Sequence, residues 1–367
     1  MASKKTATVT WIKYHNFGTY LQAYALQQAI LSLGFQNEIL DDSLLGNEKK
    51  KYTTKGLIKN FYVLIKKCIL FNFYFRRKSS IKFYQRFRNK YLHVNEDILP
   101  LHSIADKYDI FICGSDQIWF PSEHIFSPYY YLDFTQKKKI AYAPSIGTSV
   151  YPEYFKSKVK PLLEQFSFLS VREKTGADLL AEFVNKPIVT VIDPTLLLPK
   201  SHWERFIKDR DKKEDNYILC YFLTPNPWYM EYVKEFAKRK NLPVKIFATD
   251  VKYINWKNLL FAGPEEFLNA IYKSTYFFTD SFHGSIFSIL FEKRFYTFQR
   301  FEEDSQFNQN SRVRNLFRLL ELEDYFFNIN DLEKIDSLSF PDYRKVKMLL
   351  EQCRQESITY LKNALEN

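Results

Sequence analysis

Residues 275–288 read TYFFTDSFHGSIFS, an apolar segment followed by a polar turn and a second apolar segment. The first segment is rich in β-forming residues and predicts a buried strand at 276–279, and helical apolar spacing then predicts a helix at 285–292. The turn between them presents His283 and several backbone N–H groups where the helix begins. Because these N–H groups lack partners and the helix macrodipole is positive at this end, the turn favours an anion beside an ionisable side chain.

The rest of the chain shows the same alternation of strands and helices, in two blocks. The first block has predicted strands at 6–12, 37–40, 108–113, 139–143, 168–171 and 188–192, and helices at 20–33, 153–166 and 173–183. The second block has predicted strands at 217–223, 244–248, 276–279 and 295–298, and helices at 228–240, 264–272, 285–292 and 312–320. This alternation predicts an α/β protein of two doubly wound, Rossmann-like domains with largely parallel sheets.

The predicted domain boundaries follow from these two blocks. The N-terminal α/β domain covers 1–195 and includes a basic, aromatic helical segment at 56–91, and the C-terminal α/β domain covers 196–340. A predicted C-terminal helix in 341–367 could pack back on the N-terminal domain. Doubly wound sheets bind ligands beyond the carboxyl ends of their strands, so the two domains are expected to face each other across a cleft.

Polar residues that follow the predicted strands are the candidates for lining this cleft. They are Asn16, Gly18, Ser115, Asp116, Arg172, Asp280, Ser281, His283 and Gly284, and Arg312 and Arg314 at the start of a later helix could reach the same ligand. An arginine at a strand end can bind a phosphate or carboxylate through two parallel hydrogen bonds. Each candidate also has a structural interpretation: a tight turn, a helix cap, a hydrogen-bonded turn histidine, a solvated helix face or, for Arg172, an ion pair with Glu173 or Asp178.

The composition excludes several classes of protein. The chain has 367 residues, of which 46% are hydrophobic, so it can bury a large core and is not globally disordered. Its net charge of +11 favours anionic partners such as phosphates or an acidic membrane face, or describes a generally basic surface. Nucleic acid is not expected, because no zinc-ligand set, RNA-recognition signature or basic helix-turn-helix is present.

Cysteine spacing and the remaining motifs narrow the choice further. The four cysteines are widely scattered and have neither metal-binding nor disulfide-framework spacing. No Walker loop, dinucleotide fingerprint or nucleophile elbow occurs, which disfavours an ATPase, a nicotinamide enzyme or a serine hydrolase. The N-terminus leads into a strand without an export segment, and no apolar run reaches about 18 residues. We therefore expect a cytoplasmic protein whose chemistry demands no metal.

Seven short motifs, in this order along the chain, resemble the polysaccharide pyruvyl transferase family. They are NFGTYLQAYAL at 16–26, GSDQIW at 114–119, AYAPSIG at 141–147, SVRE at 170–173, DPT at 193–195, TDSFHG at 279–284 and SRVR at 311–314. The resemblance implies a two-domain fold like that of GT-B glycosyltransferases. It also implies transfer of pyruvate from phosphoenolpyruvate to a sugar of a polysaccharide precursor as a cyclic ketal, with release of phosphate.

The resemblance also implies roles for the candidate residues. The family histidine matches His283, the expected general acid, and the family arginine matches Arg172, an expected clamp for the phosphate or carboxylate of phosphoenolpyruvate. Arg312 or Arg314 would add a second clamp, and Asp116 and Asn16 would orient the acceptor hydroxyls. The donor is a substrate, so no cofactor is implied. Two alternatives stay open: a nucleotide-sugar glycosyltransferase of the same architecture, and a non-catalytic glycan- or phosphate-binding partner.

The segment 56–91 mixes basic and aromatic residues, a combination that suits an anionic membrane surface. Its basic residues include Lys66, Lys67, Arg76, Arg77, Lys78, Lys82, Arg86 and Arg88. Because acceptors in such pathways are often carried on polyprenyl diphosphate, the segment predicts peripheral docking on the inner face of the plasma membrane. The alternative is an ordinary packed helical pair with solvated lysine and arginine side chains.

Overall fold

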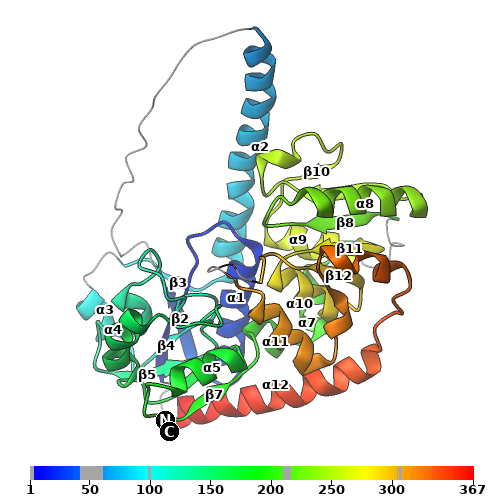
Figure 1. Ribbon diagram of the computed structural model, residues 1–367. Helices are drawn as coiled ribbons and strands as arrows, with labels where there is room; N and C mark the ends of the chain where they lie inside the picture. Colours follow the sequence, from blue (N-terminus) through cyan, green and yellow to red (C-terminus); the bar gives the residue numbers. More distant parts are fainter. Residues whose placement is uncertain (1–3, 42–60, 98–100, 210–215, 304, 306–307) are drawn as a thin grey trace.

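The N-terminal half of the chain forms a five-stranded parallel sheet. The computed structural model describes residues 4–41, 61–97, 101–209, 216–303, 305 and 308–367 (Figure 1). The sheet has the order β3–β2–β1–β4–β5, formed by β3 (Val94–Asn95), β2 (Gln36–Leu40), β1 (Lys5–Val9), β4 (Ile110–Cys113) and β5 (Lys138–Ala141). A bridge between Ile140 and Phe168 connects it to a parallel pair, β6 (Leu169–Val171) and β7 (Ile188–Thr190).

The C-terminal half forms a six-stranded parallel sheet. Its order is β10–β9–β8–β11–β12–β13, formed by β10 (Leu259–Leu260), β9 (Val244–Phe247), β8 (Ile218–Tyr221), β11 (Tyr276–Thr279), β12 (Arg294–Phe298) and β13 (Phe326–Phe327). In each sheet the chain first builds outward in one direction and then in the other, so the order reverses between β1 and β4 and between β8 and β11. Ligands bind at such switch points in doubly wound sheets.

Helices connect the strands and cover the sheets. They are α1 (Phe17–Ser32), α2 (Phe61–Tyr91), α3 (Leu101–Ala105), α4 (Glu153–Leu163), α5 (Lys174–Ala181), α6 (Pro194–Leu197), α7 (Lys200–Trp203), α8 (Pro227–Lys240), α9 (Pro264–Lys273), α10 (Phe282–Leu290), α11 (Ser311–Leu320) and α12 (Tyr343–Glu366). Most element boundaries lie within about three residues of the sequence-based ones. The fold class expected from the sequence, two doubly wound α/β halves, is confirmed.

Helix α1 lies in the core shared by the two halves. Its sequence carries no charged residue and it is buried on almost every face, as expected of a helix enclosed by protein. It packs on β2 and α2 of its own half, on α6, and on α9 and α10 of the C-terminal half. The Phe17 ring stacks on Phe267 with centroids 4.5 Å apart and also contacts Tyr221 and Phe247. One continuous hydrophobic core therefore runs from the N-terminal to the C-terminal half.

Helix α12 connects the two halves a second time (Figure 1). Near its start the Tyr343 hydroxyl donates to the carbonyl of Lys293, ahead of β12. Further along, Ser357 accepts a hydrogen bond of 3.1 Å from the backbone of Ile192, and the Tyr360 hydroxyl donates to Ala141 at the end of β5. The last helix thus begins on the C-terminal half and ends on the N-terminal half.

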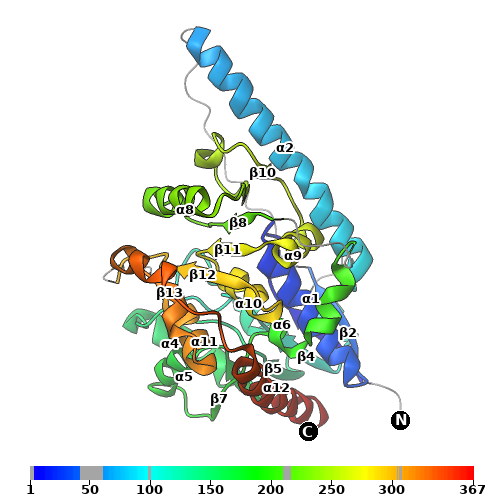
Figure 2. The ribbon, with the colours of Figure 1, turned by 90° about the vertical axis from the view of Figure 1, so that its right-hand side faces the viewer.

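Helix α2 is a single long helix whose first turns extend beyond the rest of the fold (Figures 1 and 2). Residues 56–60 of the predicted helical segment lie outside the described residues. The second half of the helix packs on α1 and α9, where Arg86 forms ion pairs with Glu265 and Glu266. Within the described parts of the chain, no helix is both long enough and apolar enough to cross a membrane.

Candidate active site

A cavity of about 440 Å³ lies between the carboxyl ends of the two sheets, and we call it the central cavity. Its wall combines residues that follow β1 and β4 with residues that follow β8, β11 and β12. Six residues predicted from the sequence line it: Asn16, Asp116, Asp280, Ser281, His283 and Arg312. The two switch points of the fold therefore share one cavity.

The junction of β11 and α10 places His283 at this cavity. Strand β11 ends at Thr279, and Ser281 caps α10 by accepting a hydrogen bond from the backbone of Gly284. The helix therefore begins at Phe282, three residues before the predicted start at Ser285. The reason is that the Ser281 hydroxyl acts as the N-cap acceptor of the helix. His283 lies in the first helical turn. A Cβ on Gly284 would approach Thr279 Oγ1 to 2.5 Å, so glycine lets α10 pack closely on β11.

Asp280 joins the ends of β8 and β11. Its carboxylate accepts backbone hydrogen bonds from Leu223 at 2.6 Å and Thr224 at 2.9 Å, which fixes the loop after β8 at the cavity. Burial raises the pKa of Asp280 to about 6, although the Arg300 charge and the two backbone donors act in the opposite direction. Asp280 therefore shapes the cavity and adds a carboxylate that titrates at unusually high pH.

His283 is held between the two halves of the molecule. Its Nε2 is buried and lies 3.6 Å from Asp193 Oδ2, slightly more than a hydrogen-bond length. On the other side of the ring, a Cβ built on Gly18 would lie only 2.0 Å from His283 Nδ1. Gly18, in the first turn of α1, therefore leaves the space that the imidazole occupies. The glycine of one half and the histidine of the other are matched in shape.

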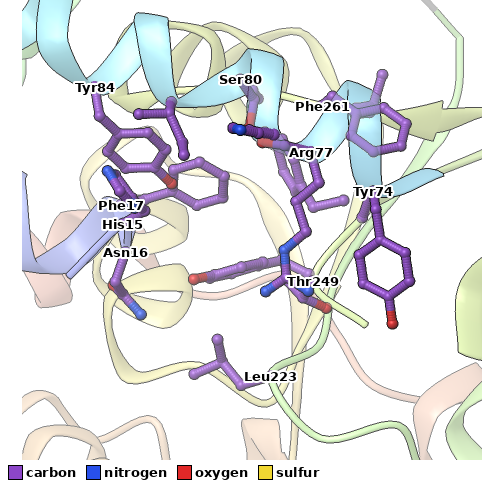
Figure 3. Close-up of a pocket in the computed structure, with 17 residues that line it drawn as sticks. His15, Asn16, Phe17, Tyr74, Arg77, Ser80, Tyr84, Leu223, Thr249 and Phe261 are labelled. Carbon is purple, nitrogen blue, oxygen red and sulfur yellow. The ribbon is translucent and has the colours of Figure 1, made fainter. Parts of the chain in front are cut away.

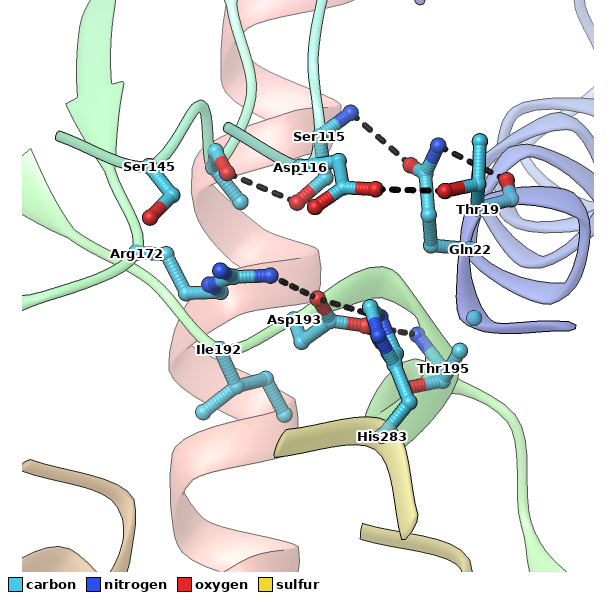
Figure 4. A network of polar contacts seen from close by, with 12 residues as sticks. Thr19, Gln22, Ser115, Asp116, Ser145, Arg172, Ile192, Asp193, Thr195 and His283 are labelled. Carbon is cyan, nitrogen blue, oxygen red and sulfur yellow. Dashed lines mark hydrogen bonds and ion pairs between the residues drawn. The ribbon is translucent and has the colours of Figure 1, made fainter. Parts of the chain in front are cut away.

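Asp193 is the centre of a buried polar network (Figure 4). It accepts hydrogen bonds from Arg172 Nη1 at 2.7 Å and from the Thr195 backbone and hydroxyl at 3.0 and 2.6 Å. Burial alone would raise the pKa of Asp193, but the charges of His283 and Arg172 and the hydrogen bonds outweigh it and hold this pKa well below its usual value. Asp193 is therefore a carboxylate that faces both the histidine and the arginine of the site.

The Arg172 guanidinium has carboxylate partners at Nε and Nη1 but none at Nη2 among the described residues. Its Nε donates to Glu173 at 3.0 Å, so the ion pair expected as the structural alternative forms, together with the pair to Asp193. Its Nη2 is buried without a hydrogen-bond partner among the described residues. The guanidinium lies 4.1 Å from the centre of the Phe282 ring and lines a second cavity of about 350 Å³, behind the central one.

Arg312 lines both cavities. Its guanidinium donates to the Gln309 side chain at 2.9 Å and lies 6.0 Å from the Phe282 ring centre. Burial, together with repulsion from Arg172, lowers the pKa of Arg312 to about 9. A bound anion would offset both effects, so Arg312, unlike the doubly ion-paired Arg172, is a candidate ligand for an anion in the cavity.

Asn16 and Asp116 approach the central cavity from the N-terminal half. Asn16 caps α1 by accepting from the Gly18 and Thr19 backbone, at 2.9 and 3.4 Å. Asp116 accepts from the Thr19 hydroxyl at 2.9 Å and from the backbone of Gln117 at 3.0 Å. Both side chains are thus oriented by local hydrogen bonds while they line the cavity.

The remaining predicted residues lie outside the wall of the central cavity. Ser115 is fully buried, and its hydroxyl donates to the Ala143 carbonyl at 2.7 Å. Gly18 and Gly284 provide close approach rather than ligand contacts. Arg314 is exposed and forms an ion pair with Glu303, because residues two apart on α11 point to nearly opposite faces.

Arg300 and Gln117, which the sequence analysis did not single out, also line the cavity. Arg300 follows β12 at the same sheet edge and donates to the Thr224 hydroxyl at 2.8 Å. Gln117 lines the cavity, and its Nε2 is buried without a partner among the described residues. The strand-end argument applies to both positions, so this signal could have identified them. Within the described residues, no group of three or more histidine, cysteine or acidic side chains could hold a metal ion.

Two parallel Rossmann-like sheets that share a cavity at their carboxyl ends define a GT-B-like α/β protein. The structure is similar to the S. aureus MnaA–UDP co-structure, with a TM-score of 0.50, 13% identity, and coverage of 95% of this chain and 91% of that chain. It also matches Acinetobacter baumannii MurG, with a TM-score of 0.43, 10% identity, and coverage of 99% of both chains. At these identities the similarity concerns the fold alone.

The sequence matches the model of the family described as polysaccharide pyruvyl transferase over residues 16–300. The chain therefore belongs to the polysaccharide pyruvyl transferase family, and the resemblance to this family is confirmed; the first six motifs lie within the matched residues, and SRVR at 311–314 lies beyond them. Comparison with curated proteins gave no match. Family and fold together support a transferase that modifies a polysaccharide.

Proposed function

We propose that the protein transfers pyruvate from phosphoenolpyruvate to a sugar of a polysaccharide precursor as a cyclic ketal and releases phosphate. The observation that carries this proposal is the gathering of His283, Arg300 and Arg312 on one cavity at the start of α10. A donor with one phosphate and one carboxylate needs several cationic groups and a proton source in a single site. Family membership supports the same reaction.

The cationic side chains and the helix start would bind the donor. Arg312 and Arg300 lie on the cavity wall, and the first N–H groups of α10 add positive potential. Arg312 has a pKa lowered to about 9 by burial and by Arg172, so an anion beside it restores the favourable charge balance. Arg172 lines the second cavity and not the central one, so it would act on the donor through its charge and through Asp193, which also faces His283.

His283 would act as the general acid. His283 lines the central cavity, from which its imidazole would hand a proton to the methylene carbon of phosphoenolpyruvate. Asp193 lies behind the ring, 3.6 Å from Nε2, and would fix its orientation, as a carboxylate behind a catalytic histidine does. Protonation makes the neighbouring carbon electrophilic.

The acceptor sugar would then react twice at this carbon. One hydroxyl adds to it and loses its proton, and a second hydroxyl displaces the phosphate, loses its proton and closes the ketal ring. Asp116 and Asn16 lie on the opposite wall from α10, where they would orient these hydroxyls. The atoms balance: of the two protons that leave the hydroxyls, one replaces the proton that His283 gives to the methylene carbon, and the other leaves with the departing phosphate as hydrogen phosphate.

Phosphate release from phosphoenolpyruvate, measured with galactose, glucose and N-acetylmannosamine acceptors, tests the function. We expect release that depends on an added acceptor. His283→Ala should lower the rate by roughly 10²–10⁴-fold, the usual contribution of a general acid. His102→Ala, which changes an exposed histidine on α3, should leave the rate unchanged. Release of a nucleoside diphosphate from a nucleotide sugar would instead indicate a glycosyltransferase, and glycan binding without either release would indicate a non-catalytic partner.

We further propose that the protein is cytoplasmic and that α2 docks it on an anionic membrane surface, the inner face of the plasma membrane. Phe71, Tyr74 and Phe75 are more than half exposed on this helix, beside the exposed Arg76 and Lys78. Exposed aromatic and basic residues on one helix suit a lipid interface. Docking would bring the site to an acceptor carried on polyprenyl diphosphate.

Sedimentation with vesicles tests this docking. We expect binding to vesicles that contain phosphatidylglycerol and little binding to neutral ones. Phe71→Ser combined with Phe75→Ser should reduce binding, whereas Tyr154→Ser, at an exposed aromatic on α4, should not. Equal binding of all three proteins to both kinds of vesicle would contradict the proposal.

A further inference from the structure

A third cavity, of about 550 Å³, lies beside the central cavity and has no role in the chemistry proposed so far (Figure 3). We call it the lateral cavity. Its wall comes from three places: the second half of α2, the residues that precede and start α1, and the carboxyl ends of β8, β9 and β10. Figure 3 shows Arg77 reaching from α2 across the opening toward Thr249, with Tyr74 beside it. The cavity therefore lies at the sheet edge where doubly wound folds bind ligands.

The charge of the lateral cavity is positive and uncompensated. Arg77 and Lys78 line it, and no aspartate or glutamate is among its lining residues, all of which the structure describes. Neither Arg77 nor Lys78 forms an ion pair with a residue in the described ranges, although their helix neighbours Arg86 and Arg88 do. Two cations that face a cavity without an acidic partner favour an anionic ligand.

The other walls are aromatic. Tyr84 stacks on Phe17 with an interplanar angle of 6°, and His15 packs edge-on against Tyr84 with centroids 5.2 Å apart. Phe247 and Phe261 line the side formed by the C-terminal sheet. Apolar surfaces with a few polar groups are typical of sites for small organic ligands, and flat aromatic faces suit the apolar face of a sugar ring.

The lateral and central cavities adjoin each other. Asn16 and Leu223 line both, so a single elongated molecule can extend from one cavity into the other. Asn16 is fixed at this junction because its side chain caps α1. A nucleoside is a poorer fit, because its ribose is usually held by an acidic side chain and the lateral cavity has none in its lining.

We propose that the lateral cavity binds a phosphate-bearing sugar segment of the acceptor, with Arg77 and Lys78 on the phosphate and the aromatic wall on the sugar. This inference rests on the proposed function, since it places the sugar that receives pyruvate in the central cavity beyond Asn16. The cations of the central cavity then serve the donor, and those of α2 serve the acceptor. The two anionic substrates are thus recognised by separate groups.

Steady-state kinetics with one acceptor in two forms tests the proposal. The acceptor sugar active in the phosphate-release assay is supplied as its 1-diphosphate and without phosphate, in the absence of lipid. Arg77→Gln combined with Lys78→Gln should raise the KM for the 1-diphosphate at least tenfold. The KM for the phosphate-free sugar and for phosphoenolpyruvate, and kcat, should stay within about twofold. Lys82→Gln combined with Lys90→Gln removes the same charge from exposed positions of α2 outside the cavity and should change none of these constants.

Three outcomes would overturn the proposal. The first is an unchanged KM for the 1-diphosphate in the Arg77 and Lys78 variant, and the second is an equal rise for both acceptor forms. The third is displacement of the bound sugar 1-diphosphate by uridine, which would assign the cavity to a nucleoside.

Failure of the proposed function gives a different result. If no acceptor stimulates phosphate release, that function is wrong, and calorimetric titration of the three sugar 1-diphosphates into the wild-type protein and both variants then decides the ligand of the lateral cavity. Binding that only the Arg77 and Lys78 variant loses would support the proposal, and absence of binding to the wild type would overturn it.

Discussion

Gly18 determines whether His283 can occupy its position at the central cavity. The imidazole Nδ1 lies where a Cβ on Gly18 would be, at a separation of only 2.0 Å, so any other residue must displace the ring. Both positions are more than nine-tenths buried, and the ring is backed by Asp193, which leaves little room for a shift. Gly18 of the N-terminal half therefore fixes the position of the proposed general acid, His283, which belongs to the C-terminal half.

We predict that Gly18→Ala impairs catalysis more than stability. Overpacking of this kind typically costs about 1–3 kcal/mol, and a loss of that size in transition-state stabilisation lowers kcat by roughly 5- to 160-fold. Phosphate release gives kcat, and thermal denaturation gives the change in stability. Gly34→Ala is the control, because Gly34 has a positive φ of 87° but open space around it, so it should lower stability alone. Equal kcat values for the Gly18 variant and the wild type would contradict the proposed alignment.

Asp280 should make the stability of the protein depend on pH. Burial raises its pKa to about 6 from an ordinary value of 3.8, so the folded protein binds this proton more tightly than the unfolded chain does. The contribution of Asp280 to stability is therefore fully present below about pH 4 and is lost as the pH rises to about 6. A shift of this size corresponds to a few kcal/mol.

Urea denaturation of the wild type and of Asp280→Asn across this pH range measures the effect. The variant loses one of the two backbone hydrogen-bond acceptors at every pH, which gives a constant offset. We expect the free energy of unfolding of the wild type, relative to that of the variant, to fall between about pH 4 and pH 6 and then to level off. Parallel profiles over the whole range would show that Asp280 does not titrate there.

At the scale of elements, α12 connects the C-terminal half to the N-terminal half through a small number of buried or partly buried hydrogen bonds. The Ser357 hydroxyl accepts from the Ile192 backbone at 3.1 Å, directly ahead of Asp193, and the Arg354 Nε donates to Leu196 at 2.9 Å. The helix thus supports the loop that carries Asp193 and, through it, the orientation of Arg172 and His283. An element distant from the catalytic motifs in sequence therefore helps to define the site.

Ser357→Ala is predicted to destabilise the protein by about 1–3 kcal/mol, because it leaves the buried Ile192 N–H without a partner. The free energy of unfolding from chemical denaturation measures this change. Gln355→Ala, at an exposed position of the same helix, should alter stability by less than about 0.5 kcal/mol. If both variants have the same stability as the wild type, α12 does not support the Asp193 loop in the way described.

Two differences from the sequence-based expectations have local causes: the start of α10 and the orientation of the two arginines of α11. The sequence placed the helix at 285, whereas the serine cap brings its start forward to Phe282 and puts His283 inside the first turn. Both arginines of α11 were proposed as anion ligands, but the helical repeat buries Arg312 and exposes Arg314. Cap chemistry and helical periodicity, both readable from the sequence, account for each difference.

For the whole molecule, the sequence predicted the sheets and the common edge of the site, because strand alternation and polar strand ends are local patterns. It did not predict which residues meet across the two halves, since such contacts depend on how the halves pack. The approach of Gly18 to His283 and the joint contacts of Asp193 with Arg172 and His283 belong to this second class. Arg300 depends on both kinds of information. Its position after a predicted strand is a local pattern, but it becomes a site residue only because β12 lies beside β11.

The shared core around α1 predicts that the two halves unfold together. Phe17 belongs to the N-terminal half by sequence, yet its ring packs on Tyr221, Phe247 and Phe267 of the C-terminal half. Calorimetry should therefore show one cooperative transition instead of two. Phe17→Ala should lower its midpoint without splitting it, with a loss of about 3–5 kcal/mol, the usual cost of truncating a buried phenylalanine. Phe340→Ala, at a half-exposed ring, should cost much less. Two separate transitions in the wild type, of which only one responds to Phe17→Ala, would show that the halves are independent folding units joined by a cleft and not by a common core.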